Sequence, residues 1–302
     1  MSATVGRMRL FIATLIASET LRVGDLSAAV DRLAQAGCAP GTPAWLDPGI
    51  AADLAFAADP AAARAALEGA FGGVDVVVQP AAGREKKLLV ADMDSTMITV
   101  ECIDELADYA GIKAQVAAVT EAAMRGELDF AGALDARVAL LEGLDEGAID
   151  RCLAERVRIM PGAVALVRTM RARGATCLLV SGGFTRFADP VAAEIGFDRA
   201  IANVLLTEGG RLTGRVAKPI VDAATKEATL RSEAARLGLS LAETLAVGDG
   251  ANDLPMVQAA GLGVAYRAKP VVAAAAGARV ERGDLRALLW AQGIAKAEWV
   301  TG

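Results

Sequence analysis

Two carboxylates two residues apart follow an apolar segment of this 302-residue chain. Residues 88–91 read Leu-Leu-Val-Ala, and Asp92 and Asp94 come directly after them in the order Asp-Met-Asp-Ser-Thr. Carboxylate oxygens are the ligands that hard cations such as Mg²⁺ prefer, and a carboxylate can also act as a nucleophile. Taken alone, the pair is equally compatible with a strand that ends in a polar turn. It marks a candidate site that needs a second observation.

A second acidic cluster provides that observation. Asp249, Asn252 and Asp253 follow the apolar segment 244–247, and a glycine on each side of Asp249 permits a tight turn with little side-chain obstruction. Ligands of open α/β sheets bind where parallel strands end, so the two clusters are expected to meet at one edge of a sheet. Their oxygen donors indicate a magnesium site and do not favour zinc.

Two further features could bind an anion. Residues 181–183 read Ser-Gly-Gly after an apolar segment, and backbone N–H groups exposed by glycines can bind a phosphate, helped by the helix that follows. Lys226 lies at the start of a helical run and could supply a positive charge. Each feature alone has an ordinary explanation, a turn in the first case and a solvated surface charge in the second.

Composition excludes several kinds of chemistry and partner. The chain contains no histidine, so it has no Ser–His–Asp triad, no Cys–His pair and no imidazole metal ligand. Its four cysteines never form a Cys-x-x-Cys pair, so we expect reduced, buried thiols. The net charge of −6 argues against a nucleic-acid partner. No stretch resembles a membrane span or a cleaved signal peptide, so we expect no membrane partner and a cytoplasmic location.

Residues 1–84 are predicted to form a small α+β domain. Apolar patterning indicates strands over 9–16, 42–47 and 74–78 and helices over 26–36 and 60–70. The order strand, helix, one or more strands, helix, strand is typical of a ferredoxin-like sandwich. The composition of residues 79–86, polar with proline and glycine, is that of a linker and predicts a boundary near residue 84.

Residues 85–302 are predicted to form an α/β domain with a parallel sheet. Short apolar strands are expected over 88–91, 176–180, 244–247 and 261–265, with helices between them. A hairpin is expected to turn at Gly209 and Gly210. The segment 100–160 carries helical periodicity without strand signals, which predicts a helical insertion directly after the first sheet strand.

In chain order, the segments Asp-Met-Asp-Ser-Thr, Val-Ser-Gly-Gly-Phe and Gly-Asp-Gly-Ala-Asn-Asp-Leu, with Lys226 between the last two, resemble the haloacid-dehalogenase superfamily and, within it, the phosphoserine phosphatases. The resemblance covers residues 87–254 at the level of motifs. It implies a Rossmann-like parallel sheet with a helical cap. It also implies Mg²⁺-dependent hydrolysis of O-phosphoserine through an aspartyl-phosphate, the last step of serine biosynthesis.

The same resemblance implies roles for the core residues. Asp92 would be the nucleophile and Asp94 the general acid and base. Asp92, the backbone carbonyl of Asp94, and Asp249 would hold Mg²⁺, and Asp253 would order the water molecules around the ion. Three groups would bind the phosphoryl oxygens, namely Ser181, the Gly182 N–H and Lys226, and Asn252 would lie nearby as a further substrate-binding residue.

In the predicted cap, the resemblance implies contacts with the rest of the substrate. Glu101 would meet the amino group of the substrate and Arg137 its carboxylate. Met124 and Phe130 would close over it as apolar cap residues. Without the resemblance, the simpler interpretation of Glu101 and Arg137 is that they are exposed helix charges.

The N-terminal unit resembles ACT-like regulatory domains in element order and position. This predicts an amino-acid ligand and a homodimer, and the alternative is a domain that only stabilises the chain.

Other functions stay open at this point. They are hydrolysis of another small phosphomonoester, phosphoryl transfer to an acceptor such as homoserine, a non-catalytic signalling module with a phosphorylated aspartate, and an amino-acid sensor built on an inactive enzyme. Asp94 argues against the signalling module, which needs no general acid beside its aspartate. No motif is broken, which argues against the inactive enzyme.

Overall fold

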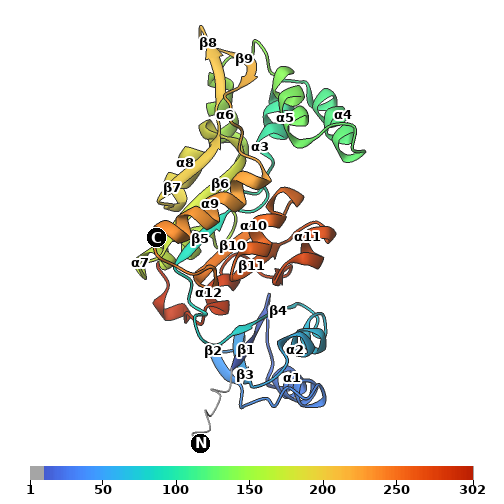
Figure 1. Cartoon of the computed structure of the whole chain (residues 1–302), viewed down its shortest axis with the longest axis vertical. Helices are drawn as coiled ribbons and strands as arrows, with labels where there is room; N and C mark the ends of the chain where they lie inside the picture. Colours follow the sequence, from blue (N-terminus) through green and yellow to red (C-terminus); the bar gives the residue numbers. More distant parts are fainter. Residues whose placement is uncertain (1–9, 302) are drawn as a thin grey trace, which may run out of the picture.

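A four-stranded antiparallel sheet with two helices on one face forms the N-terminal part of the computed structural model, which describes residues 10–301 (Figure 1). Its elements are β1 (Phe11–Ala17), α1 (Val23–Gln35), β2 (Ala44–Asp47), β3 (Ala51–Phe56), α2 (Pro60–Leu67) and β4 (Val74–Pro80). The strand order β2-β3-β1-β4 confirms the ferredoxin-like topology. The sequence pattern did not delimit β3, whose three alanines have low strand propensity. β3 is stabilised by antiparallel pairing with β1 and β2 on its two sides.

A six-stranded parallel sheet forms the core of the remaining chain, in the order β12-β11-β10-β5-β6-β7. Its strands are β5 (Leu88–Ala91), β6 (Thr176–Phe184), β7 (Arg199–Asn203), β10 (Thr244–Gly248), β11 (Leu262–Tyr266) and β12 (Ala278–Val280). The four predicted strands are confirmed and occupy the centre of the sheet. The two edge strands, β7 and β12, were not predicted, because they are short and only partly apolar. β6 also continues four residues beyond its predicted end.

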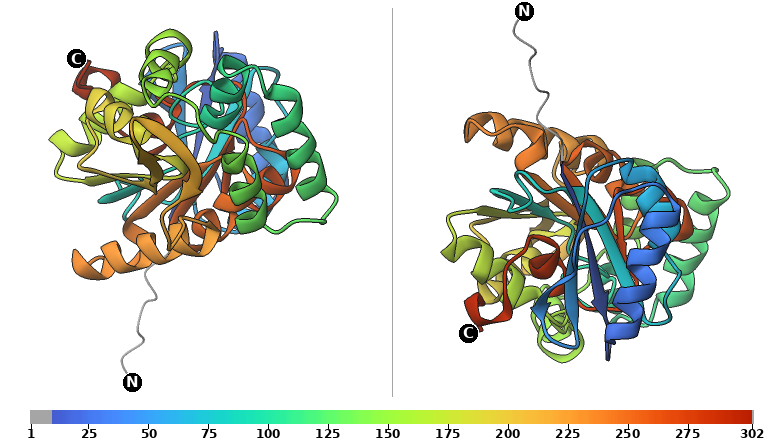
Figure 2. Two further views of the ribbon diagram at one scale, coloured as in Figure 1. Left: turned by 90° about the horizontal axis from the view of Figure 1, so that it is seen from above. Right: turned by 90° about the horizontal axis from the view of Figure 1, so that it is seen from below.

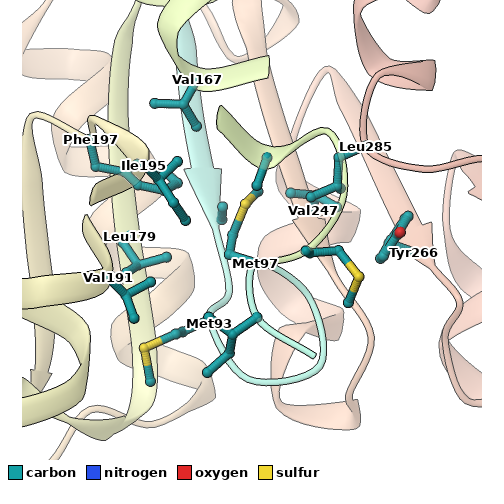
Figure 3. Packing of buried hydrophobic residues seen from close by; sticks show 14 of the residues in the cluster. Met93, Met97, Val167, Leu179, Val191, Ile195, Phe197, Val247, Tyr266 and Leu285 are labelled. Atoms are coloured by element: carbon teal, nitrogen blue, oxygen red, sulfur yellow. The ribbon is translucent and has the colours of Figure 1, made fainter. Parts of the chain in front are cut away.

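Helices cover both faces of this sheet, as expected for a Rossmann-like core. On one face, Leu88 and Val90 of β5 pack with Leu230 of α9 (Ala223–Arg236) and Met256 of α10 (Leu254–Ala259). On the other, Leu89 packs in a larger cluster that includes residues of α7 (Ala163–Ala172) and α8 (Thr185–Ile195). Figure 3 shows part of this cluster, including Val167, Leu179, Val191, Ile195 and Val247. The two-residue alternation along β5 therefore anchors the strand on both sides and fixes the position of its C-terminal end.

The predicted helical insertion is confirmed. It consists of α3 (Cys102–Tyr109), α4 (Lys113–Met124), α5 (Phe130–Ala139) and α6 (Gly147–Arg156). The predicted hairpin forms β8 (Leu205–Glu208) and β9 (Arg211–Val216), and it packs against these helices (Figure 1). Leu212 accepts a hydrogen bond from the Gly143 N–H at 2.8 Å and donates one to the Leu144 carbonyl at 2.9 Å. The cap is thus built from two segments that are distant in the sequence.

Buried polar contacts join the N-terminal sheet to the C-terminal part of the chain, which lies on the face of the sheet opposite α1 and α2 (Figure 2). The carboxylate of Asp75, in β4, accepts hydrogen bonds from three successive backbone N–H groups, those of residues 281–283. Gln79 donates to the Ala291 carbonyl at 2.6 Å. Both side chains are almost fully buried. The amino-acid ligand and the homodimer expected for this part of the chain stay predictions.

All four cysteines are buried and free of disulfides, as predicted. Within residues 10–301, no helix has the length and apolar character that crossing a bilayer would require.

Candidate active site

The two predicted acidic clusters meet at the C-terminal edge of the parallel sheet. β5 and β10 are hydrogen-bonded neighbours in which Ala91 pairs with Val247, so the residues that follow the two strands emerge side by side. One carboxylate oxygen from each of Asp92, Asp249 and Asp253 lies within 4.8 Å of the other two. The strand register therefore brings together residues more than 150 positions apart.

The donor set fits a magnesium ion. Asp92 Oδ1 accepts a hydrogen bond from Lys226, and Asp249 Oδ1 accepts one from Thr96 at 3.0 Å. Each of these carboxylates thus keeps its second oxygen for a cation. Asp253 differs, because Oδ1 bonds Lys226 and Oδ2 accepts the Asp249 and Gly250 N–H groups at 3.1 and 3.0 Å. With both oxygens occupied, Asp253 is suited to orienting the site and the water around it rather than to direct ligation.

Lys226 is completely buried, which helical periodicity alone did not suggest. Its Nζ lies 2.5 Å from Asp92 Oδ1 and 2.7 Å from Asp253 Oδ1. Burial works to lower the pKa of this amine, but the two carboxylates outweigh it and hold the pKa above its ordinary value. The helix that carries Lys226 is capped by Asp222, whose side chain accepts the Thr225 N–H at 2.8 Å. The lysine is therefore a fixed positive charge beside Asp92, the expected nucleophile.

Asp94, the expected general acid and base, is held at the start of the cap. Its Oδ1 accepts a hydrogen bond from the Cys102 N–H at 3.1 Å, at the start of the first cap helix. Burial, and then the nearby charge of Glu101, raise the pKa of Asp94 to about 7, against the lowering effect of the Cys102 hydrogen bond. A carboxyl group with this pKa can both give and take a proton near neutral pH.

The Ser-Gly-Gly segment lies inside the end of β6 rather than in a turn. Ser181 is completely buried, and its Oγ accepts the Gly183 N–H at 2.8 Å. The Gly182 carbonyl accepts a hydrogen bond from Asn203 at 2.8 Å, and Asn203 in turn accepts the Val221 N–H at 2.7 Å. Asn203 was missed from the sequence, since it lies at the end of a strand that was not predicted. It fixes the segment that the resemblance assigns to phosphate binding.

Gly183 is expected to be essential for steric reasons. A β-carbon at this position would lie 2.9 Å from Asp94 Oδ2, 3.0 Å from Ser181 Oγ and 3.1 Å from Met93 Cε. We expect Gly183→Ala to displace Asp94 and to reduce kcat by about 10²-fold, the effect of misplacing a reacting group by roughly 1 Å. Gly24→Ala, where a β-carbon would meet nothing within 4 Å, is the control. Assays of both variants beside thermal unfolding separate lost activity from lost stability, and an active Gly183→Ala enzyme would contradict the steric argument.

Core and cap residues line one cavity of about 350 Å³. Eight of the predicted site residues contribute to it: Asp92, Asp94, Glu101, Phe130, Arg137, Gly182, Asp249 and Asn252. Ser181, Lys226 and Asp253 are buried and do not line it. Met124 ends α4, and its side chain lies outside what the structure describes.

The cap side chains have identifiable partners. Glu101 is exposed and accepts a hydrogen bond from Ser95 at 2.8 Å. Arg137 donates from Nε to the Ala133 carbonyl at 3.2 Å and lines the cavity. Phe130 reaches from the cap to the parallel-sheet domain, because a β-carbon on Gly182 would lie 3.2 Å from its ring.

Thr96 and Lys269 also belong to the site or its margin and were not predicted. Thr96 could have been identified from its place in the first motif, but Lys269 carries no local signal.

Comparison with known proteins agrees with this arrangement. The family profile of haloacid dehalogenase-like hydrolases matches residues 89–258. A phosphoserine phosphatase of Streptomyces coelicolor is 50% identical over 236 residues, which are 77% of this chain but only 57% of that protein. One of Albidiferax ferrireducens is 50% identical over 208 residues, 67% of this chain and 88% of that protein. The crystal structure of a probable phosphoserine phosphatase from Vibrio cholerae aligns with a TM-score of 0.77 and 33% identity, covering 97% of this chain and 88% of that one.

Proposed function

The chain belongs to the haloacid dehalogenase-like hydrolases, and from this membership and the geometry of its cavity we propose that it hydrolyses O-phospho-L-serine to serine and phosphate with Mg²⁺. One observation carries the proposal. One cavity is lined by Asp92, Asp94 and Asp249, which could bind Mg²⁺ and react with a phosphate group. The cap adds one acidic and one basic side chain to the same lining, Glu101 and Arg137. A phosphorylated amino acid presents the matching groups, which are a phosphate, an ammonium and a carboxylate.

Mg²⁺ would be held by Asp92, the Asp94 carbonyl and Asp249, and it would neutralise part of the phosphoryl charge. Lys226 lies buried next to Asp92 at the same end of the cavity and adds a positive charge there. Its contact with Asp92 Oδ1 orients that carboxylate for attack on the phosphoryl group. The positive charges lower the repulsion between the anionic nucleophile and the phosphate dianion.

The two chemical steps need one nucleophile and one proton carrier. Asp92 attacks phosphorus as the P–O bond to serine breaks, and the protonated Asp94 carboxyl donates its proton to the departing oxygen. Asp94, now ionised, takes a proton from water, which attacks the aspartyl-phosphate and releases phosphate. Asp94 is protonated again at the end of the cycle. Its raised pKa suits both transfers.

Specificity would come from the cap. Arg137 would pair with the substrate carboxylate in a charge-assisted hydrogen bond, and Glu101 with the ammonium. Both side chains come from the insertion between β5 and β6, so the cap would supply the groups that recognise the amino-acid end of the substrate.

A panel of phosphate esters tests the proposal. We expect phosphate release from O-phosphoserine with Mg²⁺ and none with EDTA, and slower reaction with phosphoethanolamine, which lacks the carboxylate, and with sugar phosphates. Arg137→Gln is expected to raise KM for phosphoserine by about 10- to 100-fold, the value of one charge-assisted contact, and to leave phosphoethanolamine hydrolysis unchanged. Arg125→Gln, an exposed arginine paired with Glu127, is the matched control. Equal turnover of sugar phosphates would overturn the assignment of substrate.

A further inference from the structure

The cavity carries an excess of negative charge. Five carboxylates line it: Asp92, Asp94, Glu101, Asp104 and Asp249. Only two cationic side chains, Arg137 and Lys269, line it with them. A phosphate ester carries two negative charges near neutral pH, so this lining repels the substrate unless cations offset it.

Lys226 cannot provide all of that offset. Its ammonium is already shared between Asp92 and Asp253 at 2.5 and 2.7 Å, and it does not line the cavity. The three groups together carry one net negative charge when ionised. Arg137 belongs to the cap helix α5, and the proposed function uses it for the carboxylate of the substrate.

Lys269 is placed differently. It follows β11 and caps α11 (Pro270–Ala275), and its backbone N–H donates to the Asp249 carbonyl at 3.1 Å. This bond ties Lys269 to the turn that carries the predicted metal ligand. The side chain is exposed, and among residues 10–301 its ammonium has no salt-bridge partner. Lys269 also lines the same cavity as Asp249.

We propose that Lys269 attracts the phosphate group of the substrate electrostatically to the end of the cavity that Asp92 and Asp249 form. Its unpaired ammonium at the exposed margin of the cavity would counter the repulsion of the ionised carboxylates that line it as the dianion approaches. The lysine would act chiefly on association of the substrate, because Asp92 and Asp94 carry out the chemistry. This inference rests on the proposed function for the identity of the substrate, but only on the charge of a phosphate for the interaction.

Lys269→Met and Lys269→Arg test the proposal. Both keep the backbone hydrogen bond to Asp249, so the methionine variant removes only the ammonium. For Lys269→Met we expect kcat/KM to fall about 5-fold or more at low ionic strength with kcat nearly unchanged, since focused charge acts on association. The deficit is expected to shrink between about 0.02 and 0.3 M salt, because screening removes the attraction in the native enzyme. Lys269→Arg should retain most of the native value.

A second readout does not depend on turnover. Isothermal titration of inorganic phosphate into the Mg²⁺-loaded protein is expected to show weaker binding in Lys269→Met by about 3- to 5-fold, as for a partly exposed charge. Lys296→Met removes one exposed charge outside the cavity and is expected to change neither quantity. The Mg²⁺ concentration for half-maximal activity should not rise, since losing a nearby cation does not weaken metal binding, whereas a disturbed Asp249 turn would raise it.

Native salt dependence and native phosphate affinity in Lys269→Met would overturn the inference, as would a rise in the Mg²⁺ requirement that accounts for the loss. If the native enzyme failed to hydrolyse phosphoserine, the proposed function would fall. The phosphate titration would still decide the role of Lys269.

Discussion

Asp92→Asn is expected to abolish phosphate release, with kcat reduced by about 10⁴-fold or more, as for loss of a nucleophile. The side-chain amide of asparagine cannot form the aspartyl-phosphate. Asp92 is the expected nucleophile because its carboxylate contacts Lys226 and lines the cavity. The variant should remain folded. Asp92, Asp253 and Lys226 together carry one net negative charge when ionised, and the substitution removes it. Phosphate release and urea denaturation, measured on the same preparation, check both expectations.

Asp31→Asn, at an exposed position of α1, is the matched control and should keep full activity. Intact-mass measurement of the native enzyme quenched during turnover should reveal an added phosphoryl group that the Asp92→Asn protein lacks. Substantial activity of Asp92→Asn, after mass spectrometry has shown that the asparagine is not deamidated, would contradict the assignment of the nucleophile.

Lys226→Met should have the largest effect on stability. The native ammonium compensates two carboxylates, and removing it leaves Asp92 and Asp253 buried without a neighbouring positive charge. Breaking a buried ion pair in this way costs about 3–5 kcal/mol of unfolding free energy. Activity should be lost as well, because the same ammonium orients the nucleophile. Urea denaturation in EDTA, compared with the exposed-site variant Lys113→Met, measures the cost without help from a bound cation.

The stability loss of Lys226→Met should depend on pH with a defined sign. In the native protein Lys226 lowers the pKa of Asp92, while burial and Asp253 raise it, so the variant should raise this pKa further. Between the unfolded and folded pKa values, the folded variant then binds more protons than the unfolded chain, and its unfolding free energy falls as pH rises. The deficit relative to the native protein should therefore be smaller at about pH 5 than at about pH 8. A deficit that grows towards acid would show that the two carboxylates are not the cause.

The sequence by itself was sufficient for the parts of this protein that follow from local patterns. Short apolar runs indicated the four central strands of the parallel sheet, and the acidic residues directly after two of them indicated a cation site. Because the carboxyl ends of parallel strands lie at one edge of a sheet, the amino-acid order alone predicts that Asp92 and Asp249 meet. The order of the motifs then indicated the family.

Only the tertiary structure decided which side chains are buried and which distant segments are neighbours. The sequence of α9 gave no reason to expect that Lys226 is buried. The pattern of a helix shows which of its faces is apolar, but it does not show which charged residues of the sheet lie next to that helix. Asn203 and Lys269 acquire their roles from hydrogen bonds to Gly182 and Asp249, across 21 and 20 positions of the chain. The hairpin of β8 and β9 joins the cap for the same reason, since packing between elements distant in sequence leaves no mark in the local pattern of either.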